Sequence, residues 1–193
     1  MTEYVDKATQ GRIDKAHPAV REELRAIMQD VNTRLAGRAK CRLSYVLRSF
    51  EEQAALYAQG RESLAVINSL RKKAGMLPVA EAESKKKITN AMPGLSIHQY
   101  GLACDIVLMV DSNGDGSFES ASWDTRTDFD KDGKSDWLEV VEAFKQRGWS
   151  WGGDWSGFKD LPHFEKTLGH KASDLLVRRK AGKLDKDGYV LLG

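Results

Sequence analysis

The sequence predicts an α+β fold, with a small, mainly antiparallel sheet and flanking helices. Several segments repeat apolar residues at helical spacing, and short strand-like segments lie between them in no regular alternation. The chain has 193 residues, of which 41% are hydrophobic and 30% charged, and such a composition is ordinary for one packed domain. We therefore expect a single domain over residues 1–193.

The N-terminal part of the chain is expected to hold a helix, a strand and a second helix. Apolar residues at helical spacing predict an amphipathic helix over 18–35, and Gly37 follows its end. Residues 42–47 have the composition of a strand. Ser49 then caps a second helix, because Glu52 three residues later completes a capping box.

A helical insertion and a buried strand are expected next. Residues 62–90 favour helix, broken near Gly75 and Pro78, and both an inert insertion and a lid are compatible with them. The segment 102–110 is apolar and β-branched on both sides of Asp105, which is typical of a buried central strand. A carboxylate in such a strand is costly unless it is paired or binds a cation.

The C-terminal half begins with an acidic insertion over 111–139. Beyond its loops we expect a helix around 137–146, a short strand at 162–166 and a last helix near 172–180. Strands and helices therefore alternate irregularly, which favours α+β over a parallel α/β fold.

Charge and cysteine content exclude several classes of protein. The chain has 30 basic and 28 acidic residues, so its net charge of +2 gives no reason to expect a nucleic-acid partner. No stretch approaches the roughly 18 apolar residues of a membrane span, and residues 1–6 lack the pattern of a signal peptide. We expect a monomer, made in the cytoplasm and not inserted in a membrane. Cys41 and Cys104 are too few for a disulfide framework and are expected in the core.

Two histidines and two aspartates suggest a metal site at the sheet. His98 stands seven positions before Asp105, and His163 follows much later, with Asp160 three residues before it. Two imidazoles and one carboxylate, with a fourth position open, are the ligand set of a catalytic zinc site. Taken singly, each of these residues is more often structural than catalytic.

The order and spacing of these residues resemble a known family. The pattern is Ser96-x-His98-x-x-Gly101-x-Ala103-x-Asp105, then a Trp- and Gly-rich stretch, then Asp160-x-x-His163. This pattern resembles the D-alanyl-D-alanine carboxypeptidase and L-alanyl-D-glutamate endopeptidase family of zinc peptidases, whose members include phage endolysins. Residues 48–61 resemble the family's substrate-side segment, so the resemblance covers about 42–61 and 88–166.

The resemblance implies roles for the motif residues. It implies three zinc ligands and a general base, namely His98, Asp105 and His163 for the metal and Asp160 for the base. Zinc lowers the pKa of a bound water to about 7, and a nearby carboxylate takes the proton.

The same resemblance implies a substrate side. Arg48 is expected to bind substrate or to polarise the scissile carbonyl, although an ordinary surface ion pair is the alternative. Gln53 and Ser96 are expected beside it, although a serine that merely forms a turn would look the same.

The implied activity is a zinc-dependent peptidase that hydrolyses the stem peptide of bacterial peptidoglycan. The expected type is an L-alanyl-D-glutamate endopeptidase, an endolysin that acts on the cell wall after release and causes bacteriolysis. A D-alanyl-D-alanine carboxypeptidase is the alternative within the family. A different class, a non-catalytic calcium-dependent wall-binding module, is disfavoured because Asp160 and an open three-ligand site are both present.

The acidic insertion contains a match to a calcium loop. Residues 128–139 fit the twelve-residue EF-hand loop, with glycine at its sixth position, but the residues before it do not favour a helix. Its expected calcium ligands are Asp128, Asp130, Asp132, Lys134 through its carbonyl, Asp136 and Glu139. We expect bound calcium to order this insertion and to raise activity.

An earlier stretch begins the same pattern less completely. Its expected ligands are Asp111, Asn113, Asp115, Ser117 and Glu119. Ser122 stands where the bidentate glutamate belongs, so the site is weaker, and segments rich in Asp and Gly are often simply turns.

Overall fold

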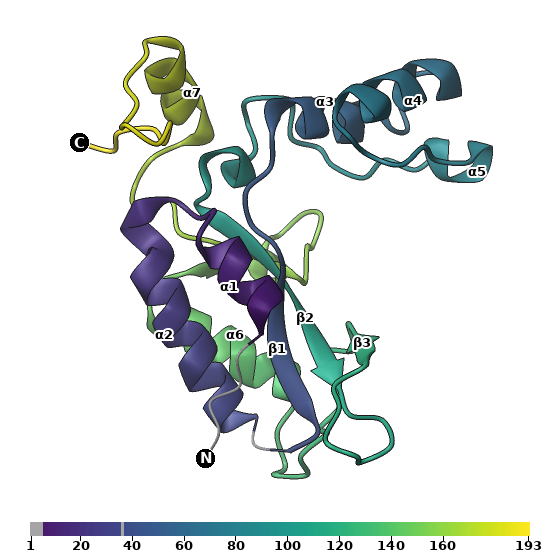
Figure 1. The fold of residues 1–193 in the computed structure, drawn as a ribbon, viewed down its shortest axis with the longest axis vertical. Helices are drawn as coiled ribbons and strands as arrows, with labels where there is room; N and C mark the ends of the chain where they lie inside the picture. The colour runs from purple at the N-terminus through teal and green to yellow at the C-terminus, as the bar shows by residue number, and fades with distance from the viewer. Residues whose placement is uncertain (1–5, 36) are drawn as a thin grey trace. The chain divides into compact units, whose positions relative to one another are not determined.

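The computed structural model describes residues 6–35 and 37–193 and confirms the α+β class (Figure 1). Residues 1–5 lie outside the described part, and they include most of the segment that lacks a signal-peptide pattern. The chain groups into two compact units. Unit 1 holds the described residues up to Val46 together with Leu102–Lys166, and unit 2 holds Leu47–Gly101 with Thr167–Gly193. The single domain over 1–193 stays a prediction.

Unit 1 is built on an antiparallel sheet in the order β1-β2-β5-β4, with β3 paired to β2. The central strand β2 (Ala103–Val110) pairs along one edge with β1 (Ala39–Tyr45). Its other edge pairs with β5 (His163–Glu165) near its start and with β3 (Ser120–Ser122) near its end. The two-residue strand β4 (Ser150–Trp151) extends the sheet beyond β5. The predicted sheet is therefore confirmed.

Strand β1 differs in its limits from the predicted 42–47. It begins at Ala39 and ends at Tyr45, and its register against β2 shifts between Leu43 and Tyr45. A shift of this kind bends a strand and ends regular pairing.

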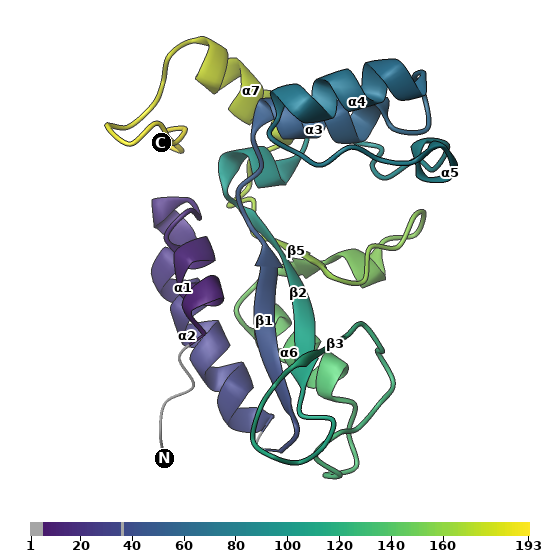
Figure 2. The same cartoon turned by 45° about the vertical axis from the view of Figure 1, so that its right-hand side comes forward.

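Among the described residues, unit 1 has three α-helices, and Figures 1 and 2 show α1 (Lys7–Ile13) and α2 (Pro18–Arg34) beside β1. The predicted amphipathic helix is α2, which buries the face expected from the spacing, namely Val20, Leu24, Ile27, Met28 and Val31. The third helix, α6 (Asp136–Gln146), packs against α2 and buries Trp137 and Phe144 completely. Burial of such side chains contributes about 1.5–3 kcal/mol each.

Unit 2 is mainly helical. It contains α3 (Phe50–Ala58), α4 (Leu64–Lys73), the single turn α5 (Glu81–Ser84), the 3-10 turn η1 (Ile97–Tyr100) and the C-terminal α7 (Ala172–Lys180). The last helix has the predicted limits. No helix in the described ranges is long and apolar enough to cross a membrane.

The capping box predicted for α3 is present. Ser49 Oγ accepts from the Glu52 N–H at 3.0 Å, and Glu52 Oε2 accepts from the Ser49 N–H at 2.7 Å. The guanidinium of Arg179 from α7 lies 4.8 Å from the ring centre of Phe50, so the first turn of α3 also receives a cation–π contact.

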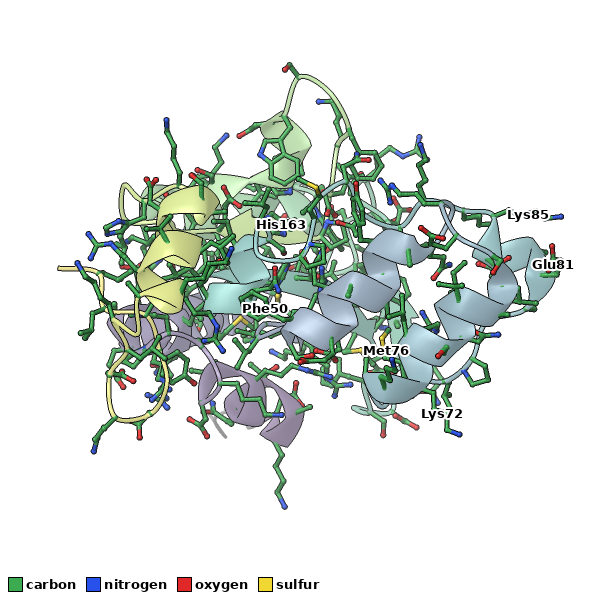
Figure 3. All side chains as sticks on the ribbon, turned by 90° about the horizontal axis from the view of Figure 1, so that it is seen from above. Phe50, Lys72, Met76, Glu81, Lys85 and His163 are labelled. Carbon is green, nitrogen blue, oxygen red and sulfur yellow. The ribbon has the colours of Figure 1, made fainter. Side chains whose placement is uncertain are left out.

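The helical insertion 62–90 breaks where the sequence predicts. Gly75, with a φ of +70°, follows the end of α4, and the chain then turns back. The Asn68 amide donates to the Val79 carbonyl at 3.1 Å and accepts from the Val79 N–H at 2.8 Å, which holds the returning chain on α4. Figure 3 labels four side chains near the ends of α4 and α5, namely Lys72, Met76, Glu81 and Lys85.

Both cysteines are buried and free, as predicted. Burial raises the pKa of the Cys41 and Cys104 thiols, so both stay protonated at neutral pH. A thiolate nucleophile at Cys104 is therefore disfavoured.

Candidate active site

Strand register brings Asp105 and His163 together. They are Cα partners on the antiparallel pair β2–β5, and directly opposed residues on neighbouring strands face the same side of a sheet. Asp105 Oδ1 lies 3.3 Å from His163 Nδ1. On the opposite face, the Phe164 ring stacks on Phe144 of α6 with centroids 4.2 Å apart. The apolar face of β5 is thus anchored in the core, and the alternate face carries the polar pair.

A second carboxylate approaches His163, which Figure 3 labels. Glu165 Oε2 lies 3.1 Å from His163 Nε2, so the ring nitrogens each face an acid. Burial disfavours a charge on His163, but the hydrogen bonds that Asp105 and Glu165 accept from its ring, and then the charges of these two acids, raise its pKa to about 9. The two carboxylates therefore attract positive charge to the His163 ring, and a divalent cation would compete with the proton for these ligand atoms.

Glu165 was missed by the sequence prediction. The available signal was its position two residues after His163 in a short strand, because alternate residues of a strand share a face. The centre of the Trp155 ring lies 5.1 Å from the centre of the His163 ring, so the indole also contacts the imidazole.

The segment from Gly94 to Gly101 forms the turn that carries His98. Gln99 Oε1 accepts from the Gly94 N–H at 2.7 Å and from the Ser96 N–H at 3.4 Å, which pins the start of η1. The Gly101 N–H donates to the His98 carbonyl at 3.2 Å, and its φ of +69° is the left-handed conformation that favours glycine. Ser96 occupies the N-cap position of η1 and is buried, as is His98.

The three predicted zinc ligands gather. His98, Asp105 and His163 each offer a ligand atom, and these atoms all lie within 4.8 Å of one another. Two imidazole nitrogens and a carboxylate oxygen fit the donor preference of zinc, and three protein ligands match a catalytic rather than a structural zinc site.

The backbone of Asp160 is fixed beside this constellation. The Asp160 N–H donates to the Gly152 carbonyl at 3.2 Å, and the Asp160 carbonyl accepts from the His163 N–H at 3.2 Å. A Cβ on Gly152 would lie 3.1 Å from Asp160 Cβ, 3.2 Å from its carbonyl carbon, and closer still to its carbonyl oxygen. Only glycine permits this approach, so the Trp- and Gly-rich stretch positions the turn from Asp160 to His163.

Arg48 and Gln53 form a separate pair in unit 2. The Arg48 N–H donates to the His98 carbonyl at 3.1 Å, and Arg48 Nη1 donates to Gln53 Oε1 at 3.0 Å. Gln53 is completely buried, and its Nε2 donates to the Ala91 carbonyl at 2.6 Å. The Gln53 amide thus orients the Arg48 guanidinium.

Comparison with known proteins supports the resemblance seen in the sequence. Residues 89–166 match the family model described as D-alanyl-D-alanine carboxypeptidase. The resemblance seen in the sequence is confirmed, and the matched segment contains the three predicted zinc ligands, the predicted base Asp160 and the acidic residues 111–139.

Two named proteins are similar to this chain. The chain is 44% identical over 118 residues to the peptidoglycan L-alanyl-D-glutamate endopeptidase CwlK of Bacillus subtilis, which covers 61% of this chain and 55% of that protein. It thus spans about half the length of this curated relative. The crystal structure of the Serratia marcescens L-Ala D-Glu endopeptidase ChiX superposes with a TM-score of 0.41 and 22% identity, covering 86% of this chain and 92% of that one.

The acidic residues 111–139 also include predicted ligands that lie close together. Three groups of carboxylates have ligand atoms within 4.8 Å of one another: Asp111 with Asp115 and Glu119, Asp128 with Asp130 and Asp132, and Asp130 with Asp136 and Glu139. Asn113, Ser117 and Lys134 lie in the same loops, where Asn113 Oδ1 accepts from the Asp115 N–H at 3.0 Å.

Proposed function

We propose that this chain is a zinc peptidase that hydrolyses the stem peptide of bacterial peptidoglycan at the L-alanyl-D-glutamate bond. The observation that carries the proposal is the gathering of His98, Asp105 and His163 within a segment of this peptidase family. The similarity to CwlK supports the choice of bond.

We assign the zinc ligands to His98, Asp105 and His163, whose donor chemistry suits the ion. Bound zinc supplies Lewis acidity, which polarises a carbonyl and makes water more acidic. Asp160 is the general base: its carboxylate accepts a proton from water as the new bond to the scissile carbonyl carbon forms. When the carbon–nitrogen bond breaks, Asp160 returns that proton to the leaving amine.

Arg48 is the proposed substrate-binding group. A guanidinium fork can hold a carboxylate or a developing oxyanion through paired hydrogen bonds, and a glutamate substrate brings a carboxylate close to the scissile bond. Gln53 acts through Arg48, because its amide is buried and donates to the Ala91 carbonyl while accepting from the guanidinium. Ser96 supports the turn that carries His98.

We further propose that the protein acts on the cell wall after release, as an endolysin does, and that bacteriolysis follows. A D-alanyl-D-alanine carboxypeptidase is the second candidate, because the matching family model carries that description.

Digestion of purified peptidoglycan by zinc-loaded protein, followed by mass spectrometry of the fragments, tests these proposals. We expect stem peptides that begin with D-glutamate. Release of free D-alanine alone would identify the carboxypeptidase, and binding to the wall without any cleavage would identify the non-catalytic module. Asp160→Asn is the matched variant, which we expect to keep zinc and to lose cleavage. Cleavage at the wild-type rate would overturn the role of Asp160.

A further inference from the structure

The loop 128–139 already has the backbone arrangement of a cation-binding turn. The Gly133 N–H donates to Asp128 Oδ2 at 2.9 Å, and Gly133 has a φ of +95°, which favours glycine at the sixth position of the loop. The Asp132 N–H donates to Asp130 Oδ1 at 3.1 Å. The main chain therefore holds the first acidic side chains of the loop on its inner side.

Five carboxylates of this loop fall into two overlapping groups. Ligand atoms of Asp128, Asp130 and Asp132 lie within 4.8 Å of one another, and so do those of Asp130, Asp136 and Glu139. Asp130 belongs to both groups. Oxygens on opposite sides of a calcium ion, each about 2.4 Å from it, are about 4.8 Å apart, so the spacing suits a single ion.

Two of these acids are buried without full hydrogen bonding, and this observation is independent of the clustering. Asp136 is completely buried; its Oδ2 accepts from the Phe129 N–H at 2.5 Å, whereas its Oδ1 has no hydrogen-bond partner among the described residues. Glu139 is only 8% exposed, and its Oε2 likewise has no such partner in the described ranges. Buried carboxylate oxygens are normally paired or bound to a cation.

The electrostatics agree with this geometry. Burial raises the pKa of Asp136 and of Glu139, and the charges of neighbouring acids raise both further. A divalent cation at the point where these oxygens converge would remove both penalties.

We propose that Asp128, Asp130, Asp132, Asp136 and Glu139 bind one calcium ion, with the Lys134 carbonyl as a further ligand. An all-oxygen set with a glutamate at the twelfth position suits calcium, which takes six to eight oxygens. Zinc prefers nitrogen and sulfur donors, and magnesium demands a tighter octahedron. This calcium site is separate from the residues assigned to catalysis and does not depend on the proposed activity.

The ion would join the loop to the core of unit 1. Asp136 and Glu139 belong to the first turn of α6, and further along the same helix Phe144 stacks on Phe164 of β5. The loop also packs closely on Gly37, where an added Cβ would lie 2.8 Å from the Cα of Asp130. Calcium would therefore stabilise the N-terminus of α6 and the packing beneath the strand that carries His163.

The earlier loop supplies a matched comparison, because it lacks the buried unpaired oxygens seen in the loop 128–139. Asp111 is buried, but its carboxylate accepts from the backbone N–H groups of Gly114 at 2.6 Å and Gly116 at 3.0 Å. Glu119 Oε1 accepts from the Ser112 N–H at 3.3 Å. In this loop, no described side-chain oxygen is both buried and without a partner. Hydrogen bonds within turns account for these acids.

Calcium titration of the zinc-loaded full chain in calcium-depleted buffer tests the proposal. Isothermal titration calorimetry should give one calcium per chain, and calcium should raise the melting temperature. Glu139→Gln should weaken calcium binding at least about tenfold, because it removes a charged bidentate ligand. The matched control Glu119→Gln, in the earlier loop, should bind calcium as the wild type does.

The melting temperatures without calcium separate a ligand from a structural residue. Glu139→Gln removes a buried charge, so without calcium its melting temperature should equal or exceed that of the wild type. With calcium it should fall below the wild type. Absence of calcium binding at millimolar concentrations, or wild-type affinity in Glu139→Gln, would overturn the proposal whether or not the protein cleaves peptidoglycan.

Discussion

Gly152→Ala is the substitution that tests most directly how the fold positions the proposed base. Gly152 belongs to none of the proposed ligand, base or substrate-binding groups. Its backbone carbonyl accepts from the Asp160 N–H, and a Cβ added to Gly152 would meet the Asp160 carbonyl group. A methyl group there strikes backbone rather than a flexible side chain, so the turn from Asp160 to His163 has to move.

The size of the effect follows from that clash. The added Cβ would lie closer than 3.0 Å to the Asp160 carbonyl oxygen, which real Cβ atoms essentially never do. Relief requires the Asp160 backbone to shift by several tenths of an ångström. Because a misplacement of about 1 Å can cost about 100-fold in rate, we expect kcat to fall about ten- to hundredfold.

The assay measures kcat on soluble peptidoglycan fragments together with zinc content and melting temperature. Gly157→Ala is the matched control, since a Cβ at Gly157 meets nothing within 4 Å, and it should leave kcat unchanged. Wild-type kcat in Gly152→Ala with full zinc content would refute the idea that this contact positions Asp160. Equal losses in both variants would refute it too, because the loss would then be general to the loop.

Three further substitutions probe the site and the fold. Glu165→Gln should lower zinc affinity about 10- to 100-fold, because a carboxylate on the second nitrogen of a ligating imidazole strengthens the ligand, and chelator competition measures it. Phe164→Ala should cost about 3–5 kcal/mol of unfolding free energy in denaturant titration, because a fully buried stacked ring is lost. Thr9 and Arg42 donate hydrogen bonds to the Asp6 carboxylate and lower its pKa despite its burial. Asp6 therefore stabilises the fold above its unfolded pKa of about 3.8, and this contribution is lost as the pH falls through its lower folded pKa. Asp6→Asn should flatten the dependence of unfolding free energy on pH in that range.

The three proposed zinc ligands could be recognised in the sequence because they stand in strongly constrained local patterns. Asp105 stands alone in an apolar strand, and the left-handed Gly101 follows His98 at the end of a short turn. The pairing of Asp105 with His163 could not be derived from spacing, because strand register depends on packing far along the chain. The family resemblance implies only that both residues bind the same metal ion.

The helices and strands that the sequence did not predict are short. The helix α1 has seven residues and buries only Thr9 and Ile13, so its apolar periodicity is too weak to recognise. The strands β3 and β4 have three and two residues, and their pairing partners define them more than their composition does. Glu165 was missed for a related reason, since its role depends on which face of β5 it shares with His163.

The acidic insertion lies, in the sequence, between the two halves of the zinc motif. Asp105 precedes it on β2, and Asp160 and His163 follow it beyond α6. The geometry of the second half depends on β5, whose apolar face packs on α6 through Phe164. A cation that stabilises the start of α6 therefore acts on the support of one proposed zinc ligand without touching the zinc itself. Oxygen donors in the loop and nitrogen donors at the strands keep the two ions chemically distinct, so calcium can tune the scaffold without displacing zinc.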